Sequence, residues 1–191
     1  PLLAPAQHHI IAGDLTALPA IQAIIEALPS TAKGAIFIAG EAQGFTLQHN
    51  TQLEIHWLSP KQAVLQQSQQ EQLQRQEQRN KQQENKELDN QSTSNSANRI
   101  AQQVLSAIQD YVQRADLITQ LTSNTTDTSG TNTPLSGLAA GENSLVLAVR
   151  DYLRKTFKLP KSLLYAVPYW RNGQDEEGYH QQRHTIMDEE Y

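Results

Sequence analysis

Hydrophobic residues along this chain follow two different spacings, which alternate from one end to the other. Short apolar runs rich in β-branched and aromatic residues are typical of buried strands. Such runs occupy residues 10–12, 35–39, 53–58 and 163–167. Apolar residues three and four positions apart are typical of amphipathic helices. That spacing covers residues 17–28, 100–121 and 145–157. Strands that alternate with helices predict an α/β fold, a parallel sheet with helices on both faces, which binds ligands at the carboxyl ends of its strands.

The turn between the first strand and the first helix falls at Gly13 and Asp14. Thr16 is the candidate N-cap of the helix, and Pro19 lies in its first turn, where a missing N–H costs little. The free N–H groups and positive dipole end at such a helix start favour an anionic ligand. Strand-to-helix turns of this kind are also common without any ligand. The turn is therefore either a phosphate site or an ordinary connection.

Two polar stretches interrupt the pattern. Residues 66–98 are dominated by glutamine, with Leu73 and Leu88 almost the only apolar side chains. Such a segment cannot bury enough surface to offset its ordering entropy, so we expect a disordered Gln-rich insertion. Residues 122–134 contain mostly Ser, Thr, Asn and Gly and predict a polar loop. The length of 191 residues favours one domain, whose core comes from the two ends of the chain.

Composition excludes several classes of function. The formal net charge of -5 opposes nonspecific nucleic-acid binding, which needs clustered lysine and arginine. The absence of cysteine excludes disulfides, thiolate metal sites and cysteine nucleophiles. No apolar run approaches the length of a membrane span, so we expect no membrane insertion. The sequence predicts no particular oligomeric state.

Hydrolytic and metal chemistry find little support in the residue pattern. His180 and His184 are four positions apart, as helical metal ligands are, but Gln181, Gln182 and Arg183 between them offer no third ligand. A solvated pair is the preferred interpretation, and we expect no protein-bound metal. No nucleophile, base and orienting group can be assembled either, which favours a redox role.

Three blocks of sequence resemble one family, the siderophore-interacting proteins, which are flavin-dependent ferric-siderophore reductases. Residues 13–20 resemble the family signature G-D-x-T-A-L-P-A. Gly141, Glu142 and the helix after them resemble its A-G-E-x-x-x-V-R-x-x-L-R element. Residues 165–173 resemble its Y-A-x-x-Y-W-R-x-G segment. The blocks stand in the family's order and close to its spacing, whereas the middle of the chain is unmatched.

The resemblance implies the NAD(P)-binding domain of a ferredoxin-reductase-like fold, normally preceded by a flavin-binding barrel. The chain opens just before the first strand, so we expect that FAD-binding barrel to be absent from it. The implied function is cytoplasmic reduction of Fe(III) to Fe(II) in a ferric siderophore, with NADPH or NADH as donor. FAD would be bound mainly by the missing domain, and this fragment would be inactive without it.

The resemblance also implies where the nucleotide binds. The first loop would cradle its pyrophosphate or nicotinamide ribose, through Gly13, Asp14, Thr16, Ala17, Leu18 and Pro19. Leu15 departs from the family, which often carries an acid there. Ser59 and Lys61 follow a predicted strand and would read the 2'-phosphate of NADPH, although a plain turn at Pro60 explains them equally well.

The C-terminal blocks would complete the redox site. Gly141 and Glu142 would lie at its mouth, where the carboxylate hydrogen-bonds the nicotinamide carboxamide or ribose, or simply caps the next helix. Tyr169 and Trp170 match the segment that approaches the flavin ring; the alternative is that they close the sheet edge. Arg171 would attract an anionic ferric siderophore.

Two other functions stay open on the sequence. One is a general NAD(P)H–flavin reductase domain without preference for siderophores. The other is a noncatalytic interaction module whose Gln-rich insertion recruits a partner.

Overall fold

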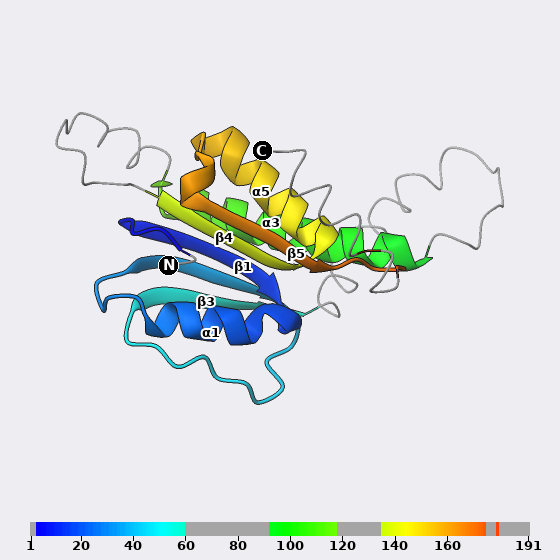
Figure 1. Cartoon of the computed structure of the whole chain (residues 1–191), viewed down its shortest axis with the longest axis horizontal. Coiled ribbons are helices and arrows are strands. Elements are labelled where there is room, and N and C mark those ends of the chain that lie inside the picture. The colour runs from blue at the N-terminus through cyan, green and yellow to red at the C-terminus, as the bar shows by residue number, and fades with distance from the viewer. Residues whose placement is uncertain (1–2, 60–91, 118–134, 175–178, 180–191) are drawn as a thin grey trace, which may run out of the picture.

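The computed structural model of the protein describes residues 3–59, 92–117, 135–174 and 179. These residues form one five-stranded sheet with helices on both sides (Figure 1). The strands are β1 (His8–Asp14), β2 (Lys33–Ala39), β3 (Gln52–Leu58), β4 (Leu135–Glu142) and β5 (Leu164–Trp170). The helices are α1 (Leu18–Glu26), α3 (Ser92–Arg114) and α5 (Asn143–Phe157), with short 3-10 helices η1 (Leu15–Ala17) and η2 (Lys161–Leu163).

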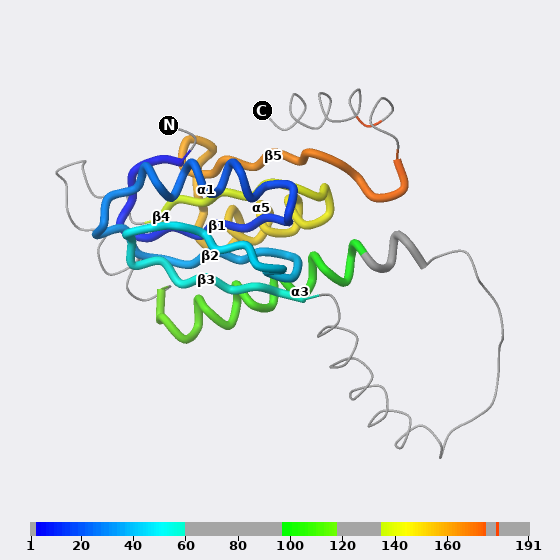
Figure 2. Tube along the Cα trace, turned by 90° about the horizontal axis from the view of Figure 1, so that it is seen from below, coloured from blue at the N-terminus to red at the C-terminus, as the bar shows by residue number. Residues whose placement is uncertain are grey.

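The sheet is parallel throughout, with strand order β3-β2-β1-β4-β5. Figure 2 looks onto it from the α1 side, with β5 at the upper edge and β3 towards the lower one. The chain adds β2 and β3 on one side of β1, then crosses over and adds β4 and β5 on the other. Such a reversal leaves a crevice at the carboxyl ends of the two central strands, which is where sheets of this type bind ligands.

The two faces of the sheet carry separate hydrophobic clusters. Neighbouring residues point to opposite faces, so Ile10 packs towards α3 and α5 while Ile11 packs towards α1. The first cluster also contains Phe37, Val104 and Val149, all fully buried. The α/β fold with a parallel sheet and helices on both faces is therefore confirmed.

The central strand β4 has no strand signal in the sequence. Its residues, LSGLAAGE, are small rather than β-branched, yet every one of them is buried. The reason is close packing, because a Cβ added at Gly137 would lie 2.7 Å from a methyl carbon of Leu153 and 2.8 Å from one of Leu164. Space between neighbouring elements, rather than strand propensity, selects the residues here.

The start of the first helix differs from the prediction. The 3-10 helix η1 precedes α1, and its N-cap is Asp14, whose carboxylate accepts from the backbone N–H of Thr16. Thr16 is therefore not the N-cap of α1, which begins at Leu18 and has Pro19 in its first turn. An aspartate at a strand end readily bonds the N–H two residues on, and here that bond decides the geometry.

Three further boundaries are corrected. Helix α3 begins at Ser92, so the last part of the predicted insertion, residues 92–98, is helical, and the helix ends at Arg114 rather than near residue 121. Strand β5 reaches Trp170, so Tyr169 and Trp170 belong to the strand instead of following it. Residues 66–91 of the predicted insertion lie outside the described residues. The predicted polar loop at residues 122–134 also lies outside them.

Candidate functional site

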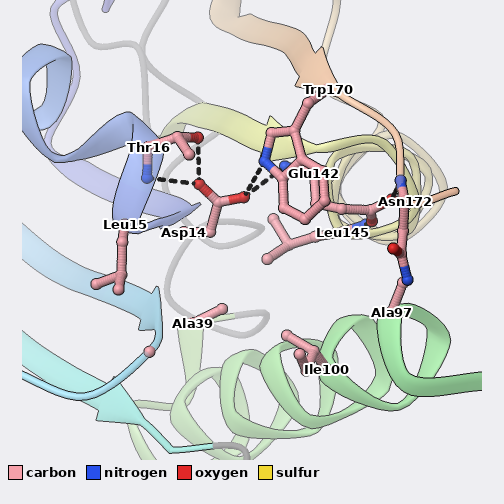
Figure 3. Close-up of a pocket in the computed structure, with 11 residues that line it drawn as sticks. Asp14, Leu15, Thr16, Ala39, Ala97, Ile100, Glu142, Leu145, Trp170 and Asn172 are labelled. Atoms are coloured by element: carbon pink, nitrogen blue, oxygen red, sulfur yellow. Dashed lines mark hydrogen bonds between the residues drawn. The ribbon is translucent and has the colours of Figure 1, made fainter. Parts of the chain in front are cut away.

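A cavity of about 380 Å³ opens at the carboxyl edge of the sheet, beside the crossover between β1 and β4 (Figure 3). Its walls come from the ends of β1, β2, β4 and β5, from η1, from the start of α5 and from α3. The lining residues are Asp14, Leu15, Thr16, Ala39, Gly40, Ala97, Ile100, Glu142, Leu145, Trp170 and Asn172. Segments distant in the sequence thus meet around one opening.

Asp14 lies at the centre of this edge and bonds three different segments. Its Oδ1 accepts from the backbone N–H of Thr16 at 2.8 Å and from the Thr16 hydroxyl at 2.5 Å. Its Oδ2 accepts from the backbone N–H of Glu142 at 2.7 Å and from the indole Nε1 of Trp170 at 2.9 Å. The residue is only 8% exposed. Both oxygens of the carboxylate therefore accept hydrogen bonds from other residues of the chain.

The two glycines of the family-like blocks make this packing possible. Gly141 has a φ of +123°, and a Cβ there would lie 2.6 Å from the carboxyl carbon of Asp14. A Cβ at Gly13 would lie 2.9 Å from both the carbonyl oxygen of Ala140 and the Cβ of Ala17. Both positions need the close approach that only glycine permits. Their roles towards a nucleotide stay predictions.

Glu142 caps the helix that follows it. Its Oε2 accepts from the backbone N–H groups of Ser144 and Leu145 at 2.6 and 3.2 Å, which makes it the N-cap of α5. Its Oε1 accepts from the backbone N–H of Asn172 at 3.3 Å. Glu142 therefore caps α5, which is one of the two roles that the sequence left open for it. The same side chain also hydrogen-bonds the segment that follows β5.

The aromatic pair divides between two environments. Trp170 is 41% exposed and lines the cavity, with its indole N–H turned towards Asp14 (Figure 3). Tyr169 packs instead against the hydrophobic cluster under α1, where burial, with smaller contributions from Tyr165 and Asp14, raises the pKa of its phenol. Arg171 is exposed beside the cavity and is not among its lining residues.

Other predicted site residues lie apart from the cavity. Ala17 and Leu18 are buried in the cluster under α1. Ser59 follows the carboxyl end of β3, where its hydroxyl donates to Glu41 at 3.0 Å and its carbonyl oxygen accepts from Gln103 at 3.2 Å. Exposed Pro19 does not line the cavity, and Lys61 lies outside the described residues.

Helix α3 supplies a wall of the cavity that the sequence pattern does not predict. Ala97 and Ile100 face the cavity across from Trp170 (Figure 3). The sequence pattern places Ala97 in the predicted insertion, because the residues around it are polar and small. Its spacing from the buried residues Ala101, Val104 and Ile108 follows the helical period and was the available signal.

The chemistry of the cavity is apolar with an acidic edge. The lining residues that the structure describes include no lysine or arginine, and both carboxylates are engaged internally. In the same part of the chain, no group of three or more His, Asp or Glu residues could hold a metal ion. His180 and His184 lie outside the described residues.

Comparison with known proteins relates the chain to one group. The family model described as siderophore-interacting protein matches residues 6–173. Two relatives named ferric vibriobactin reductase ViuB, from two strains of Vibrio cholerae serotype O1, are each 32% identical over 198 residues. The match covers 100% of this chain and 53% of each relative, so the chain spans about half of their length.

Solved structures agree with this relationship. The siderophore-interacting protein SipS of Aeromonas hydrophila matches 98% of this chain and 55% of its own, with a TM-score of 0.54 and 25% identity. The siderophore-interacting protein of Acinetobacter baumannii matches 100% of this chain and 56% of its own, with a TM-score of 0.50 and 14% identity, and shows the fold alone. None of the helices in the described part of the chain is both long and apolar enough to cross a membrane.

Proposed function

Because the chain belongs to the siderophore-interacting protein family, we propose that it is the NAD(P)H-binding half of a cytoplasmic, flavin-dependent reductase of ferric siderophores. The observation that carries this proposal is the cavity at the carboxyl edge, where Asp14 of the first family-like block bonds Trp170 of the last. The relatives named ferric vibriobactin reductase support an iron-reducing role.

The cavity fits a flat, uncharged ring better than a phosphate. Leu145 and Ile100 offer apolar walls, and the exposed part of Trp170 offers an aromatic surface for stacking. A phosphate in the same space would lie beside Asp14 and Glu142, and the described residues that line the cavity include no lysine or arginine to offset the repulsion. We therefore assign the cavity to the nicotinamide end of the nucleotide, with the side chain of Asn172 as a hydrogen-bonding group at its wall.

The phosphate-bearing end is assigned to the neighbouring carboxyl end of β3. Ser59 lies there, and Lys61 follows two positions later in the sequence. Lys61 would supply charge and Ser59 a donor, which favours NADPH over NADH. The Ser59 hydroxyl donates to Glu41 in the structure, so phosphate binding would require it to exchange that partner.

The reaction needs the chain to bind and orient rather than to provide a nucleophile. A bound NAD(P)H would supply a hydride, hence two electrons, to a flavin, which would pass them one at a time to two Fe(III) ions and release one proton. In this scheme Trp170 orients the ring in the cavity. Arg171, exposed beside the cavity, attracts the anionic ferric siderophore by charge.

Nucleotide binding to the 191-residue chain tests the proposal. Calorimetric titration should show binding of NADPH, NADH or both, and Trp170→Ala should weaken it by about threefold to tenfold through loss of stacking. Phe45→Ala is the matched control, since Phe45 is 58% exposed and does not line the cavity. The proposal would be contradicted if neither NADPH nor NADH binds. It would also be contradicted if Trp170→Ala and Phe45→Ala weaken binding equally.

The division of roles between domains is tested separately. We expect the flavin to be held mainly by another domain, so the isolated chain should carry none and should not reduce ferric siderophore by itself. An absorbance scan measures the flavin, and a stoichiometric copurifying flavin would contradict this. When the chain is joined to a relative's flavin-binding domain, faster reduction of ferric siderophore than of free flavin would argue against a general flavin reductase.

A further inference from the structure

We propose that Asp14 is a positioning residue, whose carboxylate holds the indole of Trp170 at the cavity and does not itself contact the nucleotide. This inference rests on the function proposed above, since it concerns the placement of a ring that the nucleotide meets. It also changes the role that family resemblance implies for Asp14, from a ligand-binding group to the support of one.

The first argument is the hydrogen-bonding capacity of the carboxylate. An ionised carboxylate offers about four lone-pair sites. In the structure four donors already use them, two from Thr16 on Oδ1 and two from Glu142 and Trp170 on Oδ2. A donor on the nucleotide would have to displace one of these charge-assisted bonds, which are stronger than neutral ones.

The second argument is the position of Trp170. It is the last residue of β5, which pairs with β4 and is an edge strand among the strands that the structure describes. That pairing shifts its register between Gly141 and Glu142, beside Trp170. The side chain is 41% exposed, and indole has one N–H donor, which is directed to Asp14. A bond to the end of the central strand β1 therefore anchors a partly exposed ring at the end of an edge strand.

The third argument is that the surrounding backbone leaves room for this bond. Glycine at position 141 lets the carboxyl group of Asp14 lie directly against the end of β4, because any Cβ there would overlap it. Asp14 is only 8% exposed, so water competes little for its oxygens. The result is a short polar link that spans β1, β4 and β5.

Hydrogen exchange of the indole N–H tests the link without any nucleotide. The chain has two tryptophans, and Trp57→Phe leaves Trp170 as the only indole signal in a ¹⁵N spectrum. Despite its exposure, the Trp170 N–H should exchange about tenfold more slowly than that of a free tryptophan peptide. Asp14→Ala should remove this protection, because no side-chain acceptor then remains for the indole N–H. Unprotected exchange in the unaltered chain would overturn the proposal even if Asp14→Ala fails to fold.

A double-mutant cycle on nucleotide binding distinguishes support from contact. Trp170→Phe keeps an aromatic ring but has no N–H for Asp14. Asp14→Ala should weaken NADPH or NADH binding about fivefold in the Trp170 chain and less than about twofold in the Trp170→Phe chain. Equal losses in both backgrounds would mean direct contact and would overturn the proposal. If no variant binds nucleotide, the proposed function fails while the exchange result still decides whether Asp14 holds the ring.

Discussion

The imidazole Nδ1 of His9 and the hydroxyl of Ser136 lie 2.8 Å apart between β1 and β4, at the edge of the sheet opposite the cavity. His9 is 1% exposed and Ser136 is fully buried. Burial, with a smaller contribution from the neighbouring His8, lowers the pKa of His9 from 6.5 to about 4. The native chain therefore holds this ring neutral at pH values where the unfolded chain protonates it.

The first prediction is a loss of stability in mild acid. The His9 contribution is fully present above pH 6.5, the unfolded pKa, and is lost as the pH falls towards about 4. The total loss is about 3 kcal/mol by linkage. Urea unfolding at a series of pH values between these limits measures it. His9→Gln removes the titrating group, so its free energy of unfolding should fall less steeply over the same range; identical slopes would show that His9 does not act in this way.

The second prediction compares two glycines with positive φ. Gly141→Ala should lower the free energy of unfolding by about 3 kcal/mol, since backbone strain adds to displacement of the Asp14 carboxyl group. Gly44→Ala should cost only about 1 kcal/mol, because its φ is +86° but nothing lies within 4 Å of the added Cβ. Chemical denaturation measures both. Similar losses would mean that conformational strain alone matters at Gly141.

The third prediction concerns the Gln-rich segment. Replacing residues 66–91 by a short Gly-Ser bridge should change the free energy of unfolding by less than about 1 kcal/mol, because loop closure depends weakly on length. Extending the deletion to residue 98 should be far more damaging, since it removes the start of α3 and buried Ala97 from the cavity wall. Thermal unfolding of the two variants makes the comparison. If the variant that lacks only residues 66–91 fails to fold, the segment contributes to the stability of the fold.

The fourth prediction tests the charge beside the cavity. In the chain joined to a flavin-binding domain, Arg171→Ala should weaken capture of an anionic ferric siderophore. The difference should shrink as salt rises, because charges are screened over about 10 Å at 0.1 M. Arg154→Ala, an exposed arginine in the last turn of α5, is the control. A loss that does not depend on salt would indicate a contact other than long-range attraction.

Periodicity in the sequence was enough to predict the α/β class, because strands buried on both faces read as apolar runs and helices as spaced ones. It failed for β4. The close packing of Leu153 and Leu164 leaves room only for glycine at position 137, so β4 lacks the β-branched residues that indicate a strand. It failed again at the start of α3, where polar residues precede Ala97. Local patterns do not record how closely distant elements pack.

For the candidate site, family resemblance identified Asp14, Glu142 and Trp170, and the structure brings all three together. Their bonds to one another could not be predicted, because each partner lies on a different strand or helix. The contribution of Ala97 and Ile100 was missed for the same reason. A wall formed by a helix across the cavity is a property of the assembled layers.

The bond between Asp14 and Trp170 joins residues 156 positions apart in the chain. A nascent chain that has not yet reached β5 lacks one wall of the cavity and the donor that Asp14 receives. The site is therefore incomplete until the long loop between the two ends of the chain has closed. A ligand that binds there selects molecules whose whole sheet is complete, so its binding energy stabilises the entire fold rather than one loop.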